Sequence, residues 1–313
     1  MPYTAMGQTE LANHIPEIMV RSANEGLEYL RKYLNLARTV RKDFGGDFAT
    51  RGKVLNIPVR GTLTVNDKTA KNNVTVQAPQ DDTVQVILNK HKEVTFLIED
   101  VAQAVAIPGA LEAYIRDAVA VLAEQVEMDL AGEYVNAGTT LDLGDFASWR
   151  EAMRRARRTL VTNKIPANSP MFAQLDEYAV ESILGETGIE DASKFGNNRP
   201  LIDGSIEKLA GISLFESQVV GIDDSTSPDT YYPIVYGSDA MVLAVRPLPD
   251  WGNGNGVSQM SVSDAESGLA MRSTIGYDKN GLGLQVTLDM LYGVKTIRPE
   301  LLVAISHEPS VNN

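Results

Sequence analysis

The sequence predicts an α+β fold with a mostly antiparallel sheet. Two-residue hydrophobic alternation recurs between residues 52 and 100, and one long amphipathic helix follows it. Residues 140–280 then mix helices, short strands and Gly/Pro-rich loops, and a strand-rich segment closes the chain. This order of elements is typical of α+β proteins.

The bulk composition is that of a folded protein without thiol chemistry. The chain has 313 residues, 43% hydrophobic and 22% charged, enough for one large domain or two to three subdomains. It contains no cysteine, which excludes disulfides, thiolate catalysis and cysteine-based zinc sites. The N-terminus lacks a signal-peptide pattern, and no stretch reaches the roughly 18 apolar residues of a membrane helix. We therefore expect synthesis in a cytoplasm and no membrane partner.

The charge is negative overall and unevenly distributed. The formal net charge is −13 and the pI is about 4.8, whereas proteins that bind polyanions non-specifically are usually basic. Residues 1–98 carry 13 basic and 10 acidic side chains, residues 99–145 carry one and ten, and residues 165–280 carry six and seventeen. This asymmetry indicates that different parts of the chain meet different neighbours.

Two N-terminal segments have too few apolar residues for cores of their own. Residues 10–43 read as helical pieces, with leucines at mostly helical spacing between basic residues. Residues 52–98 predict a long β-hairpin with the polar run NDKTAKNN (66–73) at its tip. Because an isolated hairpin is marginally stable in water, we expect both segments to lie on another surface, in this chain or in a partner.

A long spine helix is predicted between Gly109 and Gly138, the glycines that punctuate its two ends. About 28 residues in a helix give a length of roughly 42 Å, well above the usual length. The apolar positions recur in steps of four and three: Leu111, Ile115, Ala118, Leu122, Val126 and Leu130. One face is therefore apolar, and the rest is heavily acidic.

The C-terminal region predicts two strands. Hydrophobic residues alternate over 284–290, and Tyr292-Gly293 is expected to form a turn. A second strand follows and closes with residues 302–305, and Pro299 is expected to break or bulge the pairing before it.

Residues 146–161 form a predicted helix in which five arginines occupy one side. On a helical wheel, Phe146, Trp149, Met153, Ala156 and Leu160 fall within about 80° of one another. The rest of the wheel carries the basic residues Arg150, Arg154, Arg155, Arg157 and Arg158. Three interpretations stay open: a solvated face, ion pairs with an acidic partner surface, and contact with phosphate. No aromatic residue lies among the arginines, so stacking on nucleic-acid bases has no support.

The sequence offers little that predicts catalysis. His14, His91 and His307 lie far apart, and we interpret each as an ordinary surface or core residue. GNGNG (252–256) lacks dinucleotide-binding spacing, and DDSTSPD (223–229) lacks the glycine and the closing glutamate of an EF-hand loop. We therefore predict no catalytic residue, no cofactor and no metal.

The layout resembles the major capsid proteins of tailed bacteriophages, which share the Hong Kong 97 fold, in the coat-protein branch without a proteolysed N-terminal scaffold segment. RGKVLNIPV (51–59) looks like the entry strand of the family's extended loop, and KEVTFLIED (92–100) looks like its return. Residues 110–134 are similar to the family's spine helix. KLAGISLFESQVV (208–220) is similar to a strand of the axial domain, and residues 289–305 are similar to the closing strands.

The resemblance implies four parts. Residues 1–50 would form an N-terminal arm and residues 51–98 the extended loop. Residues 99–139 and 281–313 would form a peripheral domain around the spine helix, and residues 140–280 an axial α+β domain. Lys68 and Lys71 would stand near the tip of the extended loop.

The function that the resemblance implies is self-assembly into an icosahedral shell around double-stranded DNA, without catalysis. Its partners would be copies of itself in hexamers and pentamers, a portal, and scaffolding or decoration proteins. The packaged DNA would be a neighbour by non-specific proximity. The virion would be the location, with assembly in the host cytoplasm. The alternatives are an encapsulin-type shell around protein cargo, an acidic soluble hydrolase, and a nucleic-acid-binding module that uses the arginine helix.

Some members of the family lock their shells with a Lys–Asn isopeptide bond from the extended loop. Lys68 and Lys71 are suitably placed, but no position here matches the partner asparagine or the catalytic carboxylate. We therefore predict no autocatalytic cross-link, so assembled particles should give a single band of about 34.0 kDa on a denaturing gel. A covalent ladder of subunits would contradict this.

Overall fold

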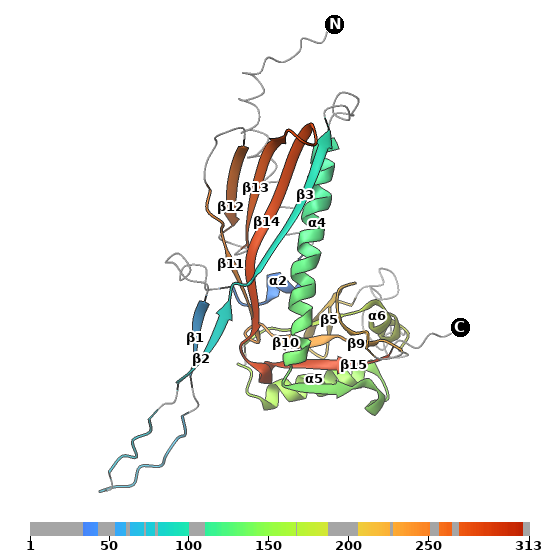
Figure 1. The fold of residues 1–313 in the computed structure, drawn as a ribbon. Coiled ribbons are helices and arrows are strands. Elements are labelled where there is room, and N and C mark those ends of the chain that lie inside the picture. The colour runs from blue at the N-terminus through green and yellow to red at the C-terminus, as the bar shows by residue number, and fades with distance from the viewer. Residues whose placement is uncertain are drawn as a thin grey trace.

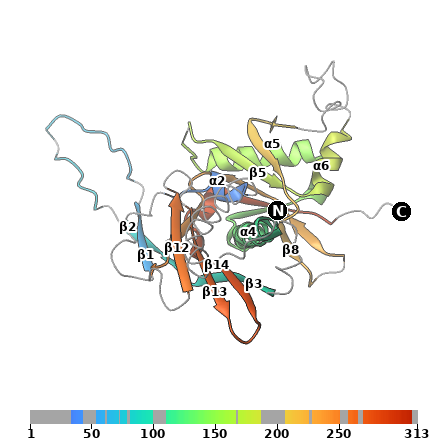
Figure 2. The same cartoon turned by 90° about the horizontal axis from the view of Figure 1, so that it is seen from above.

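The chain forms an elongated body, with a compact unit at the foot of helix α4 and a long loop that points away from both (Figures 1 and 2). In this computed structural model, the residues that the structure describes are 34–42, 54–60, 63–71, 73–78, 81–99, 110–166, 168–186, 206–225, 228–250, 257–264 and 269–308. Most of the predicted arm lies outside these residues. Its described part holds the short helix α2 (Leu36–Thr39).

The elongated body is organised around one long strand, β14 (Gly283–Thr296). One edge of β14 pairs first with β13 (Leu269–Asp278) and then with β11 (Met241–Arg246), both antiparallel. The other edge pairs antiparallel with β3 (Lys90–Glu99). The sheet is completed by β12 (Val257–Asp264), which pairs with β13.

Helix α4 (Ala110–Ala131) lies along one face of this sheet, as Figure 1 shows. Its 22 residues span about 33 Å, and a 3₁₀ turn (Gly132–Asn136) extends it. The predicted apolar positions that the structure describes are all buried: Ile115, Ala118, Leu122, Val126 and Leu130. The amphipathic spine expected from the sequence is therefore confirmed.

The compact unit is built on a six-stranded mixed sheet in the order β4-β15-β10-β5-β7-β6. The strands are β4 (Thr139–Asp142), β5 (Met171–Leu175), β6 (Lys208–Leu209), β7 (Ile212–Glu216), β10 (Ile234–Gly237) and β15 (Leu302–Ser306). β4 is parallel to β15 and β5 to β7, and the other pairs are antiparallel. Helix α5 (Trp149–Thr162) packs against β15 and β10 and beside α6 (Glu177–Leu184).

A small ribbon of β8 (Gly221–Asp223) and β9 (Thr230–Tyr232) borders the compact unit. One continuous hydrophobic core joins this unit to the elongated body, because it includes residues of α2, α4, α5, β14 and β15. The two sheets therefore share a core.

The predicted hairpin pairs differently from the expectation. β1 (Val54–Arg60) pairs with β2 (Asp81–Ile87), so the return strand of the loop is β2. Lys90–Glu99, which was expected to return from the loop, instead joins the large sheet beside β14. Both segments alternate, and β14, with 14 residues, is long enough to pair with all ten residues of β3.

The predicted turn at Tyr292-Gly293 is also wrong, because both residues lie inside β14. Tyr292 is fully buried, and a Cβ on Gly293 would press against the carbonyl oxygen of Ile87. The glycine allows the end of β2 to cross close to β14. The predicted break at Pro299 is confirmed by a 3₁₀ helix, Pro299–Leu301.

The sheets group some segments differently from the four predicted parts. β12 and β13, expected in the axial domain, pair within the sheet of the elongated body. β15, expected in the peripheral domain, pairs with β4 and β10 of the compact unit. The division into four domains stays a prediction, with these two departures.

Substituting Gly293 with alanine should destabilise the fold, because the new methyl group would press on the backbone of Ile87. We expect a loss of about 1–3 kcal/mol in the free energy of unfolding, measured by urea denaturation. Gly132→Ala is the matched control, since a Cβ there meets nothing within 4 Å. Equal effects of the two substitutions would contradict this account of Gly293.

Candidate interaction surfaces

Helix α5 is fixed by its caps and by its apolar stripe. Ser148 accepts a hydrogen bond from the backbone N–H of Glu151, whose carboxylate accepts one from the N–H of Ala147. This reciprocal arrangement starts the helix at Trp149, three residues later than Phe146, where the predicted stretch begins. The predicted apolar positions within the helix are all buried: Trp149, Met153, Ala156 and Leu160.

The five arginines of α5 are all exposed. None forms an ion pair with a carboxylate of the described part of the chain. The guanidinium of Arg157 lies over the turn between β6 and β7, where a Cβ on Gly211 would be 3.4 Å from its Cζ. The helix therefore presents a basic surface whose counter-charges are not supplied by the acidic residues described here.

The finger (residues 54–87) is the second exposed feature. Its distal part, 63–71 and 73–78, has no regular secondary structure. The side chain of Gln77 bridges the two limbs, because its Oε1 accepts from the N–H of Thr64 at 2.9 Å and its Nε2 donates to the carbonyl of Thr64 at 2.5 Å. This contact replaces a backbone pair with a side chain and keeps the limbs together.

The finger carries apolar side chains in solvent. The exposed fraction is 98% for Val65 and 87% for Val76, and Leu63 and Val74 are also exposed. Lys71 has a positive φ of 71° in a turn of the distal finger, and Lys68 lies three residues before it on the chain. Both lysines lie in the described distal part of the finger, and their assignment as the tip of an extended loop stays a prediction.

The base of the finger, unlike its tip, has a core. The buried cluster joins β11 and Ile297, which directly follows β14, to residues at the base of the finger: Leu55, Ile57, Val86 and Leu88. The finger is therefore anchored at its root, and the rest of its length projects from the body.

The described part of the arm is held by one buried carboxylate of α4. Glu127 is 4% exposed, and its two oxygens accept hydrogen bonds from the backbone N–H groups of Asn35, Leu36 and Ala37 at 2.9–3.0 Å. These donors belong to the first turn of α2, which otherwise lacks a side-chain cap. Burial raises the pKa of Glu127, and the three hydrogen bonds oppose that rise.

Two further carboxylates near the end of α4 hold β14. Asp129 accepts a hydrogen bond from the hydroxyl of Tyr292 at 2.6 Å and pairs with Lys90 at 2.8 Å. Burial, and then the bond to Asp129, raise the pKa of the Tyr292 hydroxyl, so it stays protonated and donates. Glu133 accepts from both the N–H and the hydroxyl of Thr296.

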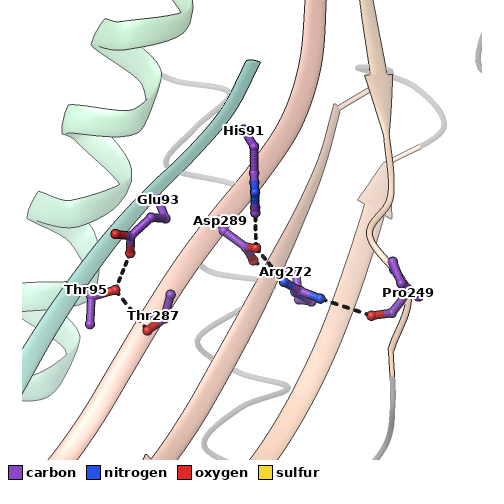
Figure 3. Close-up of polar contacts among 7 residues, drawn as sticks. All are labelled: His91, Glu93, Thr95, Pro249, Arg272, Thr287 and Asp289. Carbon is purple, nitrogen blue, oxygen red and sulfur yellow. Dashed lines mark hydrogen bonds and ion pairs between the residues drawn. The ribbon is translucent and has the colours of Figure 1, made fainter. Parts of the chain in front are cut away.

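Both described histidines pair with an aspartate that is remote in sequence. On the sheet face opposite α4, the carboxylate of Asp289 is shared by His91 at 2.8 Å and by Arg272, which also donates to the carbonyl of Pro249 (Figure 3). On the same face, Figure 3 shows the hydroxyl of Thr95 between Glu93 and Thr287.

The second histidine lies in the compact unit. His307 bonds to the fully buried Asp176 at 2.9 Å, and its ring contacts those of Trp149, edge-on, and Tyr231. Asp176 also accepts from the N–H of Ala179 and so caps α6. Sequence reasoning missed both pairs, since the partners are 198 and 131 residues apart. His14 lies outside the described residues.

The acidic loop near Asp223 is organised by its own hydrogen bonds. The hydroxyl and the N–H of Ser225 donate to Asp223 and lower the pKa of its carboxyl. Among the described residues, no group of three or more histidines or acidic residues has the arrangement of a metal site. No described helix is long and apolar enough to cross a membrane. GNGNG (252–256) lies outside the described residues.

Comparisons with solved structures identify the fold, although neither a family model nor a curated protein matches the sequence. A structure from Mycobacterium phage Che8 has a TM-score of 0.64 and 21% identity over 87% of this chain and 90% of that one. The capsid structure of cyanophage P-SCSP1u has a TM-score of 0.62 and 15% sequence identity, over 86% of each chain. A virus-like particle from Pyrococcus furiosus has a TM-score of 0.50 and 11% sequence identity, over 92% of this chain and 99% of that one. The predicted α+β capsid fold is therefore confirmed.

The stability contributed by Glu127 should depend on pH. Its pKa is raised in the folded protein, so the contribution is complete below the ordinary glutamate pKa of 4.5 and is lost as the pH rises through the raised value. The unfolding free energy of the wild type, minus that of Glu127→Gln, should therefore fall as the pH rises above about 4.5.

Urea denaturation at stepped pH, with amide exchange of residues 35–37, measures this effect. Glu124→Gln, at an exposed position of the same helix, is the matched control and should show no such trend. A difference that stays constant across the range would contradict the raised pKa of Glu127.

Proposed function

We propose that this chain, which has the fold of tailed-phage capsid proteins, is a major capsid protein that assembles into an icosahedral shell around double-stranded DNA. The observation that carries the proposal is the finger, which projects beyond the body with its valines in solvent (Figure 2). In a monomer the apolar side chains of the finger stay in water, whereas a subunit of an assembly can bury them on a neighbouring subunit. The likeness to phage capsid structures supports the same conclusion.

The proposed shell is built from hexamers and pentamers, in which fingers and arms lie across adjacent subunits. The negative charge of the chain would limit its adhesion to the packaged DNA, which is held by enclosure and not by specific contacts. A portal and scaffolding or decoration proteins would complete the particle, and the virion would be the final location after assembly in the host cytoplasm. We infer a structural role rather than a catalytic one, as in the capsid proteins that share the fold.

The encapsulin alternative shares the fold and differs in cargo. The likeness to phage capsid structures gives this alternative no greater support than the phage capsid proposal. Neighbouring genes would separate the two: portal and terminase genes for a phage, or a cargo enzyme for an encapsulin.

Expression of the full chain followed by negative-stain microscopy tests the proposal. Closed shells of uniform size are the expected result. Protein that stays monomeric at high concentration, with and without co-expressed scaffold, would overturn the proposal.

Changing Val65 and Val76 to serine should weaken assembly without affecting the fold. Both side chains are almost fully exposed in the subunit, so the free energy of unfolding should change by less than about 0.5 kcal/mol. If the valines are buried on a neighbour, the protein concentration needed for assembly should rise by about tenfold, measured by sedimentation.

Val135→Ser, at a 73% exposed position on the body, is the matched control. Assembly of the finger variant at the wild-type concentration would argue against a contact through the finger.

A further inference from the structure

Helix α4 carries a second stripe, on the side away from its buried face. Tyr114, Asp117, Val121, Glu124 and Met128 follow steps of three and four and fall within about 80° of the helix wheel. Its large apolar residues are exposed: Tyr114 by 54%, Val121 by 56% and Met128 by 51%. They repeat every seven residues, with the two carboxylates between them.

This pattern is typical of a helix that packs against another helix. A seven-residue apolar repeat places one apolar side chain about every two turns along the same side of the helix, where each can contact a partner helix. The sheet already covers the opposite side of α4, so this seam is not needed for the core of the subunit. Apolar residues in such a row, with acidic residues among them, indicate a basic amphipathic partner.

Helix α5 supplies a stripe of opposite charge. Arg150, Arg154, Arg157 and Arg158 fall within about 100° of its wheel, together with Val161, which is 55% exposed. The stripe is about 17 Å long, and the stripe of α4 is about 21 Å long. The two stripes are therefore similar in length and opposite in charge, and each contains an apolar component.

We propose that the acidic stripe of α4 on one subunit packs against the arginine stripe of α5 on a second copy of this chain. This inference rests on the proposed function and assigns two of the contacting elements. Asp117 and Glu124 face the guanidinium groups, which can bind carboxylates with two parallel hydrogen bonds. Val161 adds apolar contact to the seam of Val121 and Met128.

The partner is another copy because the two helices cannot meet within one chain. α5 is fixed on β15 and β10 through its buried stripe, and Figure 1 shows it on the far side of β15 from α4. A phosphate backbone is a less suitable partner. It would not use Val161, nor would it explain the apolar seam of α4.

The contact joins two different surfaces, so each subunit engages one neighbour through α4 and another through α5. Such head-to-tail contacts propagate from subunit to subunit and close when the rotation between copies divides a full turn. They suit a ring of subunits and not an isolated two-fold dimer.

Charge reversal and its compensation test the pairing. Arg154→Glu with Arg158→Glu should reduce the yield of sedimenting shells by about tenfold or more, and so should Asp117→Arg with Glu124→Arg. The chain that carries all four substitutions should recover shells, because the signs are exchanged on both stripes. Glu181→Arg with Glu216→Arg, on exposed positions of the compact unit, changes the net charge as much as Asp117→Arg with Glu124→Arg and should assemble normally.

Cross-linking tests the geometry without relying on assembly yield. The chain has no cysteine, so Val121→Cys or Met128→Cys can each be combined with Val161→Cys, and assembled shells treated with a bismaleimide. A ladder of linked subunits is expected for at least one double variant. A mixture of the two single variants should give dimers only, and Val161→Cys alone should give none.

Several outcomes would overturn the inference. They are normal assembly of both charge-reversed variants, failure of the fourfold variant to recover, or the absence of any ladder in intact shells. Arginine variants that assemble normally but lose salt-sensitive retention of DNA would assign the α5 stripe to phosphate instead. If the wild type forms no shells, the proposed function fails first. Shells that are insensitive to every variant overturn only this contact.

Discussion

The contact between α4 and β14 joins the principal elements that the structure describes. Asp129 and Glu133 bind Tyr292 and Thr296, while the apolar face of α4 packs into the core shared by both sheets. β14 in turn pairs with β13 and β11 on one edge and with β3 on the other. Glu127 adds the arm to the same helix. The segments at the edge of the described fold are thus attached to the packed contact between α4 and β14.

The helices could be predicted because their signal is local. The buried positions of α4 and α5 recur at helical spacing within single stretches, so a reading of 14 to 22 residues contains the whole pattern. The exposure of the five arginines of α5 could be predicted from the same helical wheel. Surface features that depend on one helix alone, such as this basic face, are therefore visible in sequence, although their partner is not.

Pairings between remote segments could not be predicted in the same way. β2 and β3 both alternate, and the choice between them depends on the length of β14, almost 200 residues away. The His91–Asp289 and His307–Asp176 pairs depend on strand register and on the ends of two helices, which no local pattern encodes. Tyr292-Gly293 resembles a turn only until the crossing of Ile87 is known. The missing information is tertiary in each case.

The bridge between Gln77 and Thr64 has a consequence for the geometry of a closed particle. In the described part of the distal finger, the side chain of Gln77 joins the two limbs, and these residues form no strand ladder. Bending such a segment breaks few hydrogen bonds, so conformers that differ in curvature lie close in energy. An icosahedral particle with both hexamers and pentamers places chemically identical chains in several local environments. A stiff root with a compliant end allows one sequence to satisfy all of them.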